Sequence, residues 1–397
     1  MIEDTSILPV YAPSLRVSHG QGTWLFTSEN EKYLDFVMGV ASNTFGHCHP
    51  PLVQALQEQI GKLWHVSNLF LSDVQIQFAE NLTNSCFADR VFFCNSGAEA
   101  LETCIKMARR FHFHNGDQKR THFITYQGAF HGRTMATLAA TGREDLSRGF
   151  APLPEGFQKL SFGSFDETEA AVNDHTAGII VEPIQGEGGV RVADRKWMQF
   201  LRDLCDRKGI VLILDEVQCG MGRTGKLYAH MWSGIVPDIM ALAKGIGGGF
   251  PLGACLATEK VSQGMSLSSH GSTFGGNALA MVAGNAVLSL LQSAGVLEGV
   301  QVNGDLLRKK MLSFVKDNDD IVCDARGLGL LQALVCRKPN QAVAKTAREE
   351  HFLVAPAGEN TIRLLPPLNV TVDEFEFAFS ALDRASSRLR EQSDNAV

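Results

Sequence analysis

Short apolar runs alternate with amphipathic segments over most of the chain. Six of these runs lack the polar alternation of half-exposed strands, and they predict strands buried on both faces at residues 91–93, 122–125, 178–181, 210–214, 239–242 and 253–257. Between them, apolar residues recur at helical spacing, most clearly after Pro50-Pro51 and after Ser96-Gly97. This order predicts an α/β architecture with a mainly parallel sheet.

The pattern changes after residue 290. Two amphipathic helices follow, then a strand-like stretch around 329–336 and a final helix that Thr371 and Glu374 open with capping-box spacing. These elements predict a second, smaller domain. Near the N-terminus, TWLFT and KYLDF predict short strands that the pattern assigns to neither domain.

Composition excludes several classes of protein. The 397 residues are 45% apolar and 20% charged, enough for a large core, and the net charge of -7 with scattered Lys and Arg argues against a nucleic-acid partner. Nine cysteines without a CxxC motif indicate reduced thiols. No apolar run approaches the roughly 20 residues of a membrane span, and the first residues resemble no export or import signal. We therefore expect a cytoplasmic protein without membrane contact.

Reactive or glycine-flanked residues follow five of the predicted strands. In open α/β sheets ligands bind beyond the carboxyl ends of the strands, so these residues are expected to form one site. They are the segment Asn95 to Ala98, the segment Tyr126 to Arg133, and the side chains of Glu182, Asp215 and Lys244.

The stretch VLILDEVQCGMGRTGK, residues 211–226, resembles parts of a nucleotide hydrolase. An aliphatic run ends in Asp215-Glu216, and GMGRTGK matches the GxxxxGK of a phosphate-binding loop. However, Leu227 stands where such a loop has a magnesium-binding Ser or Thr, and one strand would have to serve both halves. An ATP-binding protein is therefore a weak alternative.

Asp215 and Lys244 are better explained as partners around an aldehyde cofactor. A desolvated lysine becomes an amine nucleophile, and pyridoxal phosphate needs a carboxylate that keeps its pyridine nitrogen protonated. At about 4 Å and an effective dielectric of about 20, that ion pair contributes roughly 4 kcal/mol before desolvation. The phosphate would bind where Ser96 opens a helix. The i, i+2 histidine pairs at 47/49 and 112/114 have no carboxylate cluster, so no metal is expected.

Six ordered blocks carry a resemblance to a known family. They are NSGAEA (95–100), AFHGRT (129–134), EPIQGEGG (182–189), LDEVQCGMGRTG (214–225), ALAKGIGGGFPLGA (241–254) and HGSTFGGNALA (270–280). The chain resembles the class III, or ω-, aminotransferases of pyridoxal-phosphate fold type I over nearly its whole length. The resemblance implies a large domain with a mainly parallel seven-stranded sheet at 51–290, and a smaller α+β domain at 291–397 that segment 1–50 joins.

The resemblance also implies roles for the residues at the strand ends. Lys244 would be the Schiff-base lysine and proton carrier, and Asp215 the partner of the pyridine nitrogen. The other cofactor-binding residues would be Ser96, Gly97, Ala98, Phe130, Glu216, Val217, Gln218 and Thr273. Thr273 would reach the phosphate of the other subunit, which implies a homodimer with shared active sites.

Four further residues would bind substrates. Arg133 would hold the carboxylate of acetylornithine, with Ser272 of the neighbouring chain close by. Arg363 would hold the α-carboxylate of glutamate, and Glu182 would neutralise Arg363 when no substrate carboxylate is there. One arginine must be available to one substrate and masked for the other, and a movable ion pair provides this.

The substrate is the least certain part of the resemblance. LWHVSNLF, residues 63–70, is most similar to enzymes that transfer the terminal amino group of N2-acetyl-L-ornithine to 2-oxoglutarate in arginine biosynthesis. Succinylornithine, ornithine, succinyl-diaminopimelate and 4-aminobutyrate are alternative substrates, and a pyridoxal-phosphate aminomutase is an alternative enzyme. Ala98 replaces a usual Thr, and Leu101 stands at a position that is often Asn, so cofactor affinity is expected to be lower.

Overall fold

The computed structural model describes residues 6–394, and its largest element is a seven-stranded sheet. The strand order is β4-β12-β11-β10-β7-β5-β6, with bounds β4 (Arg90–Cys94), β5 (His122–Tyr126), β6 (Phe157–Leu160), β7 (Thr176–Val181), β10 (Val211–Asp215), β11 (Ile239–Leu242) and β12 (Gly253–Ala257). Only β12 runs antiparallel to its neighbours. The mainly parallel seven-stranded sheet and the six predicted strands are confirmed, whereas the short, half-polar β6 was not predicted.

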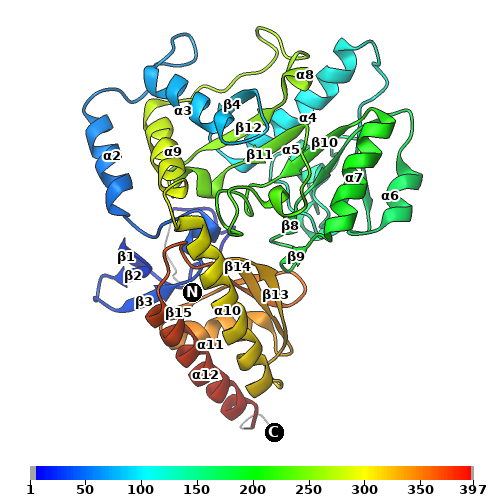
Figure 1. Ribbon diagram of the computed structural model, residues 1–397. Helices are drawn as coiled ribbons and strands as arrows, with labels where there is room; N and C mark the ends of the chain where they lie inside the picture. Colours follow the sequence, from blue (N-terminus) through cyan, green and yellow to red (C-terminus); the bar gives the residue numbers. More distant parts are fainter. Residues whose placement is uncertain (1–5, 395–397) are drawn as a thin grey trace.

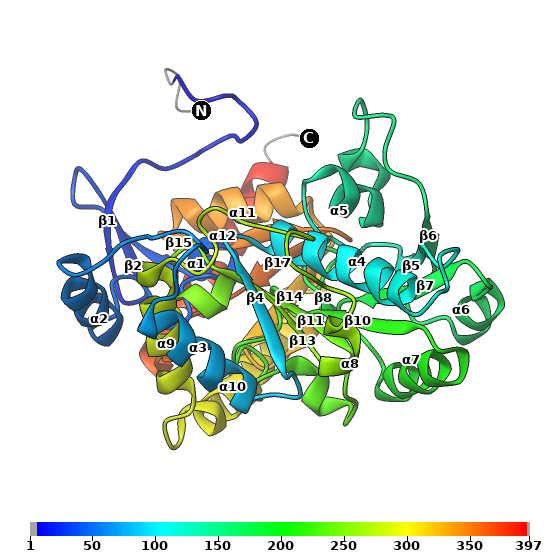
Figure 2. The same ribbon diagram turned by 90° about the horizontal axis from the view of Figure 1, so that it is seen from above.

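Helices cover both faces of this sheet because its strands present apolar side chains on both sides. Ile180 and Ile213 pack with α4, while their chain neighbours Ile179 and Leu212 pack with α7. Figure 2 shows α4 and α7 on either side of β10. The helices around the sheet are α2 (Pro50–Ile60), α3 (Asp73–Asn84), α4 (Gly97–His114), α5 (Met135–Ala140), α6 (Phe165–Ala171), α7 (Arg195–Lys208), α8 (Glu259–Ser262) and α9 (Ala278–Leu291).

The rest of the chain gathers below the large sheet in Figure 1, where the N-terminal strands lie beside β15 and the C-terminal helices. One small sheet contains β1 (Val17–Gln21), β2 (Trp24–Thr27), β3 (Lys32–Asp35) and β15 (Phe352–Leu353), and another contains β13 (Val322–Leu328), β14 (Leu331–Cys336), β17 (Thr361–Leu364) and β16 (Ala355–Ala357). The helices here are α10 (Val296–Asp317), α11 (Asn340–Glu349) and α12 (Val372–Asp394).

The pairing of β3 with β15 links the two ends of the chain. The predicted strands TWLFT and KYLDF are present. The predicted capping box of α12 is confirmed as well, since Thr371 N donates to Glu374 Oε2 at 2.9 Å and Glu374 N to Thr371 Oγ1 at 3.3 Å. The domain boundaries near residues 50 and 290 stay a prediction.

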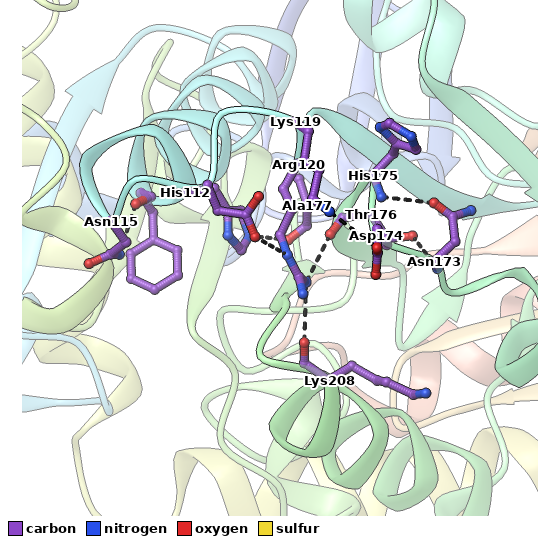
Figure 3. Close-up of polar contacts among 12 residues, drawn as sticks. His112, Asn115, Lys119, Arg120, Asn173, Asp174, His175, Thr176, Ala177 and Lys208 are labelled. Carbon is purple, nitrogen blue, oxygen red and sulfur yellow. Dashed lines mark hydrogen bonds and ion pairs between the residues drawn. The ribbon is translucent and has the colours of Figure 1, made fainter.

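Polar contacts fix the end of α4 that lies away from the predicted site (Figure 3). The Arg120 guanidinium pairs with Asp117 at 2.7 Å and donates to the carbonyls of Thr176 and Lys208. His112 Nε2 lies 2.8 Å from the carbonyl oxygen of Ala177. These bonds tie the C-terminal end of α4 to β7 and α7, so that its N-terminal end stays at the carboxyl edge of the sheet.

Within residues 6–394, no single helix is long and apolar enough to cross a membrane. The bent pair of α9 and α10, which meet at 73°, passes the same test only in combination. The same residues hold no group of three or more His, Cys, Asp or Glu side chains arranged to bind a metal ion.

Candidate active site

A cavity of about 370 Å³ lies at the carboxyl ends of the central strands. This volume suits a small ligand. Most of the predicted site residues line it, namely Ser96, Gly97, Ala98, Phe130, Arg133, Glu182, Asp215, Val217, Gln218 and Lys244. Asn95, His131 and Gly132, which belong to the predicted strand-end segments, line the cavity as well. The wall is completed by residues that were not predicted, namely Ser42, Glu187, Ala243 and the segment 249–252.

The N-terminus of α4 forms one end of this cavity. Ser96 is its N-cap, and its hydroxyl accepts from Glu99 N at 3.2 Å. A Cβ on Gly97 would lie 2.8 Å from Val217 Cγ1, so only glycine lets the helix start this close to the strand end after β10. The N–H groups of Gly97 and Ala98 belong to the first turn, which has no helical acceptors, and they fit an anion such as a phosphate.

Asp215 lies at the end of β10 and is 3% exposed. Its Oδ1 accepts from Val217 N at 3.0 Å, and its Oδ2 lies 2.8 Å from His131 Nδ1. His131 is buried as well, and its Nε2 has no hydrogen-bond partner among residues 6–394. The imidazole thus fixes the carboxylate that faces the cavity. Sequence reasoning gave His131 no role, although it follows Phe130 within the AFHGRT block.

Lys244 follows β11 directly, in a backbone conformation with φ 49°. Such a conformation is strained for a residue with a side chain, and strain of this kind concentrates at functional sites. Burial lowers the pKa of the Lys244 amine, and the charge of Arg363 acts in the same direction, whereas Glu187 and Asp215 oppose the shift. A lowered pKa favours the neutral, nucleophilic amine.

Arg363 pairs with Glu187, which corrects the prediction that Glu182 would be its partner. The Arg363 side chain is 3% exposed, and its Nη1 donates to Glu187 Oε1 and, at 3.4 Å, to Gln218 Oε1. The Glu182 carboxylate instead accepts from Phe130 N at 2.9 Å and from Gly186 N at 3.3 Å. Burial raises the pKa of Glu182 well above its ordinary range, and Asp215 adds to that shift. The hairpin β8 (Ile184–Gln185) and β9 (Arg191–Val192) carries Glu187, rather than Glu182, toward Arg363.

Glu216 does not line the cavity, contrary to its predicted place among the cofactor-binding residues. Successive side chains of an extended segment point to opposite sides, so the neighbour of Asp215 points away. The Glu216 carboxylate is buried, accepts from the backbone N–H groups of Ala229 and His230, and lies 2.7 Å from His230 Nδ1.

The glycine-rich segment after Glu216 contacts the C-terminal part of the chain, close to β14 and β17. Arg223 is buried and donates to the carbonyls of Leu330 and Pro366 at 3.3 and 2.5 Å. Lys226, the lysine of the apparent phosphate loop, donates to Met231 O at 3.0 Å. No helix begins directly after it, so this segment lacks the geometry of a phosphate-binding loop.

The remaining predicted residues lie at the mouth of the cavity or outside it. Arg133 is exposed, with its guanidinium 5.4 Å from the centroid of the Phe130 ring. Ser272 and Thr273 line a separate hollow beside Asn95, whose amide donates to Ser272 Oγ at 3.2 Å. Their reach into a neighbouring subunit stays a prediction.

Comparison with known proteins identifies the family of the chain. The family model described as aminotransferase class-III matches residues 9–385. A relative from Mesorhizobium japonicum, named acetylornithine aminotransferase, is 52% identical over 375 residues, which is 94% of each chain.

Solved structures extend the match. An N-acetylornithine aminotransferase from Stenotrophomonas maltophilia is 35% identical, with a TM-score of 0.84 over 96% of this chain and 98% of that one. A PLP-bound amine transaminase from an uncultivated Pseudomonas species is 28% identical, with a TM-score of 0.90 over 97% of each chain. The chain therefore belongs to the class III aminotransferases and is a pyridoxal-phosphate-dependent enzyme.

Proposed function

We propose that the enzyme transfers the terminal amino group of N2-acetyl-L-ornithine to 2-oxoglutarate, giving N-acetyl-L-glutamate 5-semialdehyde and L-glutamate. The observation that carries this proposal is the Glu187–Arg363 ion pair at the cavity. In this pair Glu187 neutralises an arginine that can bind a substrate carboxylate, and a substrate carboxylate can take the place of Glu187. The relative from Mesorhizobium japonicum, which bears the name acetylornithine aminotransferase, supports the choice of substrate.

The chain provides a fitting group for each part of the cofactor. The N–H groups of Gly97 and Ala98 would hold the phosphate, Asp215 the pyridine nitrogen, and Phe130 and Val217 offer apolar surfaces to the ring. When bound, pyridoxal phosphate supplies the electron sink that lets the C–H bond beside the substrate amine break. Asp215 keeps that sink charged, and His131 holds Asp215 in place.

Lys244 is the proposed nucleophile and proton carrier. Its lowered pKa leaves more of the amine neutral near pH 7 than an ordinary lysine has, so it can accept the proton of the amine-bearing carbon. The strained backbone and the short 3-10 turn that it opens hold the amine toward the cavity that Asp215 also lines. Phe250 and Leu252 give this cavity apolar walls.

The two substrates make opposite demands on Arg363. Glutamate and 2-oxoglutarate carry a carboxylate next to the reacting carbon, and that carboxylate would displace Glu187 and form a bidentate pair with Arg363. The terminal amine of acetylornithine has no carboxylate there, so Glu187 would stay on Arg363 and prevent an unpaired buried cation. Arg133, exposed at the mouth, would hold the distant carboxylate of acetylornithine.

We also propose a homodimer with shared sites, in which Thr273 reaches the phosphate of the neighbouring subunit and Ser272 approaches its Arg133. Large apolar side chains are exposed near these residues, namely Trp64, Leu69, Phe70, Leu71 and Phe274. Asn68 Nδ2 donates to the carbonyls of Ser272 and Gly275 at 3.0 Å each, so the two segments form one surface. Such a surface is typical of a protein interface.

Absorbance spectra and substrate rates test the reaction. The purified holoenzyme should be yellow, and added glutamate should shift its visible band toward that of the amine form of the cofactor. Steady-state rates with 2-oxoglutarate should be highest for acetylornithine among acetylornithine, succinylornithine, ornithine, succinyl-diaminopimelate and 4-aminobutyrate. Equal rates for all five amines would contradict the substrate assignment.

Sedimentation and cofactor titration test the dimer. Phe70→Asp should produce monomers that bind pyridoxal phosphate more weakly, because each site would lose Thr273 of its neighbour. Leu312→Asp, which changes an exposed leucine on α10, should remain dimeric and serves as the control. A Phe70→Asp dimer with normal cofactor affinity would contradict the shared site.

A further inference from the structure

Release of Glu187 from Arg363 leaves a carboxylate that needs another partner. The Asp215 carboxylate already lines the same cavity, so it would repel an unpaired carboxylate of Glu187 there. The amine of Lys244 lies within the field of Glu187, but it is the proposed nucleophile and proton carrier. An efficient exchange therefore requires a further cation within reach of Glu187.

The backbone places Arg143 next to Glu187, on the other side of Gly128. Gly128 N donates to the carbonyl of Gly142 at 3.1 Å, which fixes the residue before Arg143. On the opposite side, a Cβ on Gly188 would lie only 2.5 Å from the carbonyl oxygen of Gly128. Arg143 and Glu187 each adjoin a residue that touches Gly128. An arginine side chain is long and flexible, so that of Arg143 can extend past Gly128 toward Glu187.

Arg143 is held by a partner that it can leave easily. Its Nε and Nη2 lie 3.2 and 2.7 Å from the two carboxylate oxygens of Asp145. The Asp145 side chain is 60% exposed and that of Arg143 31%, and an ion pair open to water contributes little to stability. The hydrogen bond with Asp145 is the main reason that the pKa of Arg143 is raised, and the field of Glu187 adds a smaller part.

Two other arginines lie near the mouth of the cavity, and each contacts a different group. Arg133 lies over the Phe130 ring, where it is the proposed partner of the distant substrate carboxylate. Arg191 lies 3.5 Å from Glu359. Arg143 differs from Arg191 in having the more exposed carboxylate as its partner, since the Asp145 side chain is 60% exposed and that of Glu359 43%.

We propose that Arg143 is the second partner of Glu187: it receives the carboxylate when glutamate or 2-oxoglutarate takes Arg363, and it returns the carboxylate when acetylornithine binds. Arg143 is then a positioning residue that acts through Glu187 and lowers the cost of one half-reaction only. This inference rests on the proposed function.

The two half-reactions of the holoenzyme, followed separately by stopped-flow absorbance, test this role. Arg143→Gln should raise the apparent dissociation constant of glutamate about three- to five-fold, the upper range for the loss of a solvent-accessible ion pair, and change that of acetylornithine by less than about two-fold. Arg143→Lys should recover part of the loss. Arg148→Gln, which changes an exposed arginine on the same loop, should leave both constants unchanged.

A double-mutant cycle shows whether Arg143 acts through Glu187. In a Glu187→Gln background, Arg143→Gln should have no further effect on glutamate binding. Equal losses for both substrates, an unchanged glutamate constant, or additive effects in the cycle would each overturn the role of Arg143. A wild-type holoenzyme that reacts with neither substrate would overturn the proposed function itself. This outcome differs from a failure of the Arg143 role, because it is seen in the wild type without any variant.

Discussion

Gly97→Ala is expected to disturb the phosphate end of the cavity by a collision that the structure defines. The added methyl group would lie 2.8 Å from Val217 Cγ1, 3.1 Å from Val217 Cγ2 and 3.6 Å from Ala243 Cβ. Carbon atoms attract each other best at about 3.5–4.0 Å, so two of these contacts are repulsive. Either Val217 or the first turn of α4 must move, and both line the cavity.

The size of the effect follows from opposing contributions. Overpacking costs about 1–3 kcal/mol, whereas alanine in place of glycine stabilises a helix interior by up to about 1 kcal/mol and its first residue by less. We expect a net destabilisation of about 1–2 kcal/mol. For a chain of this length the unfolding entropy is about 0.8 kcal/mol per kelvin, so Tm should fall by about 1–3 °C. A loss of about 1.4 kcal/mol at the phosphate would weaken cofactor binding about ten-fold.

Thermal unfolding and cofactor titration of a double-mutant cycle test this reasoning. Val217→Ala removes both methyl groups that the new Cβ would meet, and should therefore rescue Gly97→Ala with a coupling energy of about 1 kcal/mol or more. Val217→Ala alone reports the cost of the lost packing. If Gly97→Ala keeps its full penalty in the Val217→Ala background, or has no penalty in the wild type, the close approach of α4 does not explain the glycine.

Three further substitutions address the chemistry and the buried charges. Lys244→Ala should abolish transamination while the dimer stays folded, as activity assays and sedimentation would show; retained turnover would place the nucleophile elsewhere. Asp215→Asn should still bind the cofactor but lose most of the rate, because an amide cannot hold the ring nitrogen protonated; a rate near that of wild type would exclude this role. Glu182→Gln should change how stability depends on pH. Since the pKa of Glu182 is raised above 4.5 in the folded protein, the contribution of this group is fully present below pH 4.5 and is lost as the pH rises, by at most about 1.4 kcal/mol per unit. Urea unfolding of cofactor-free protein at pH 5, 6 and 7 should show this slope for wild type relative to the variant, and parallel curves would refute it.

Apolar runs predicted the central strands because burial on both faces leaves a clear pattern in the sequence. The direction of β12 left no such pattern, since its side chains are as buried as those of β11, which runs in the opposite direction. The polar strand β6 lies at the edge of the sheet and was missed because half of its surface is not covered by apolar packing.

Site residues that end strands were easier to predict than those on returning loops. Lys244 and Asp215 follow buried runs directly, and the cavity contains both. The partner of Arg363 depends on how the hairpin after β7 folds back, so sequence alone did not distinguish Glu187 from Glu182. His131 lay within the predicted segment 126–133 but was given no role, because a histidine beside an aromatic residue has no distinctive spacing and only the fold brings it to Asp215.

The reversed strand β12 determines how the lysine is mounted. Because β11 and β12 run antiparallel, the chain returns to the sheet within ten residues after Lys244, and Leu242 and Ala254 pair directly. The return passes Gly249 and Leu252, which form the wall beside the amine. Lys244 thus lies on a short connection whose two ends are both paired strands of the sheet. Because this connection holds the backbone of Lys244 in place, the amine can move between the steps of the cycle only by rotation about the side-chain bonds of Lys244.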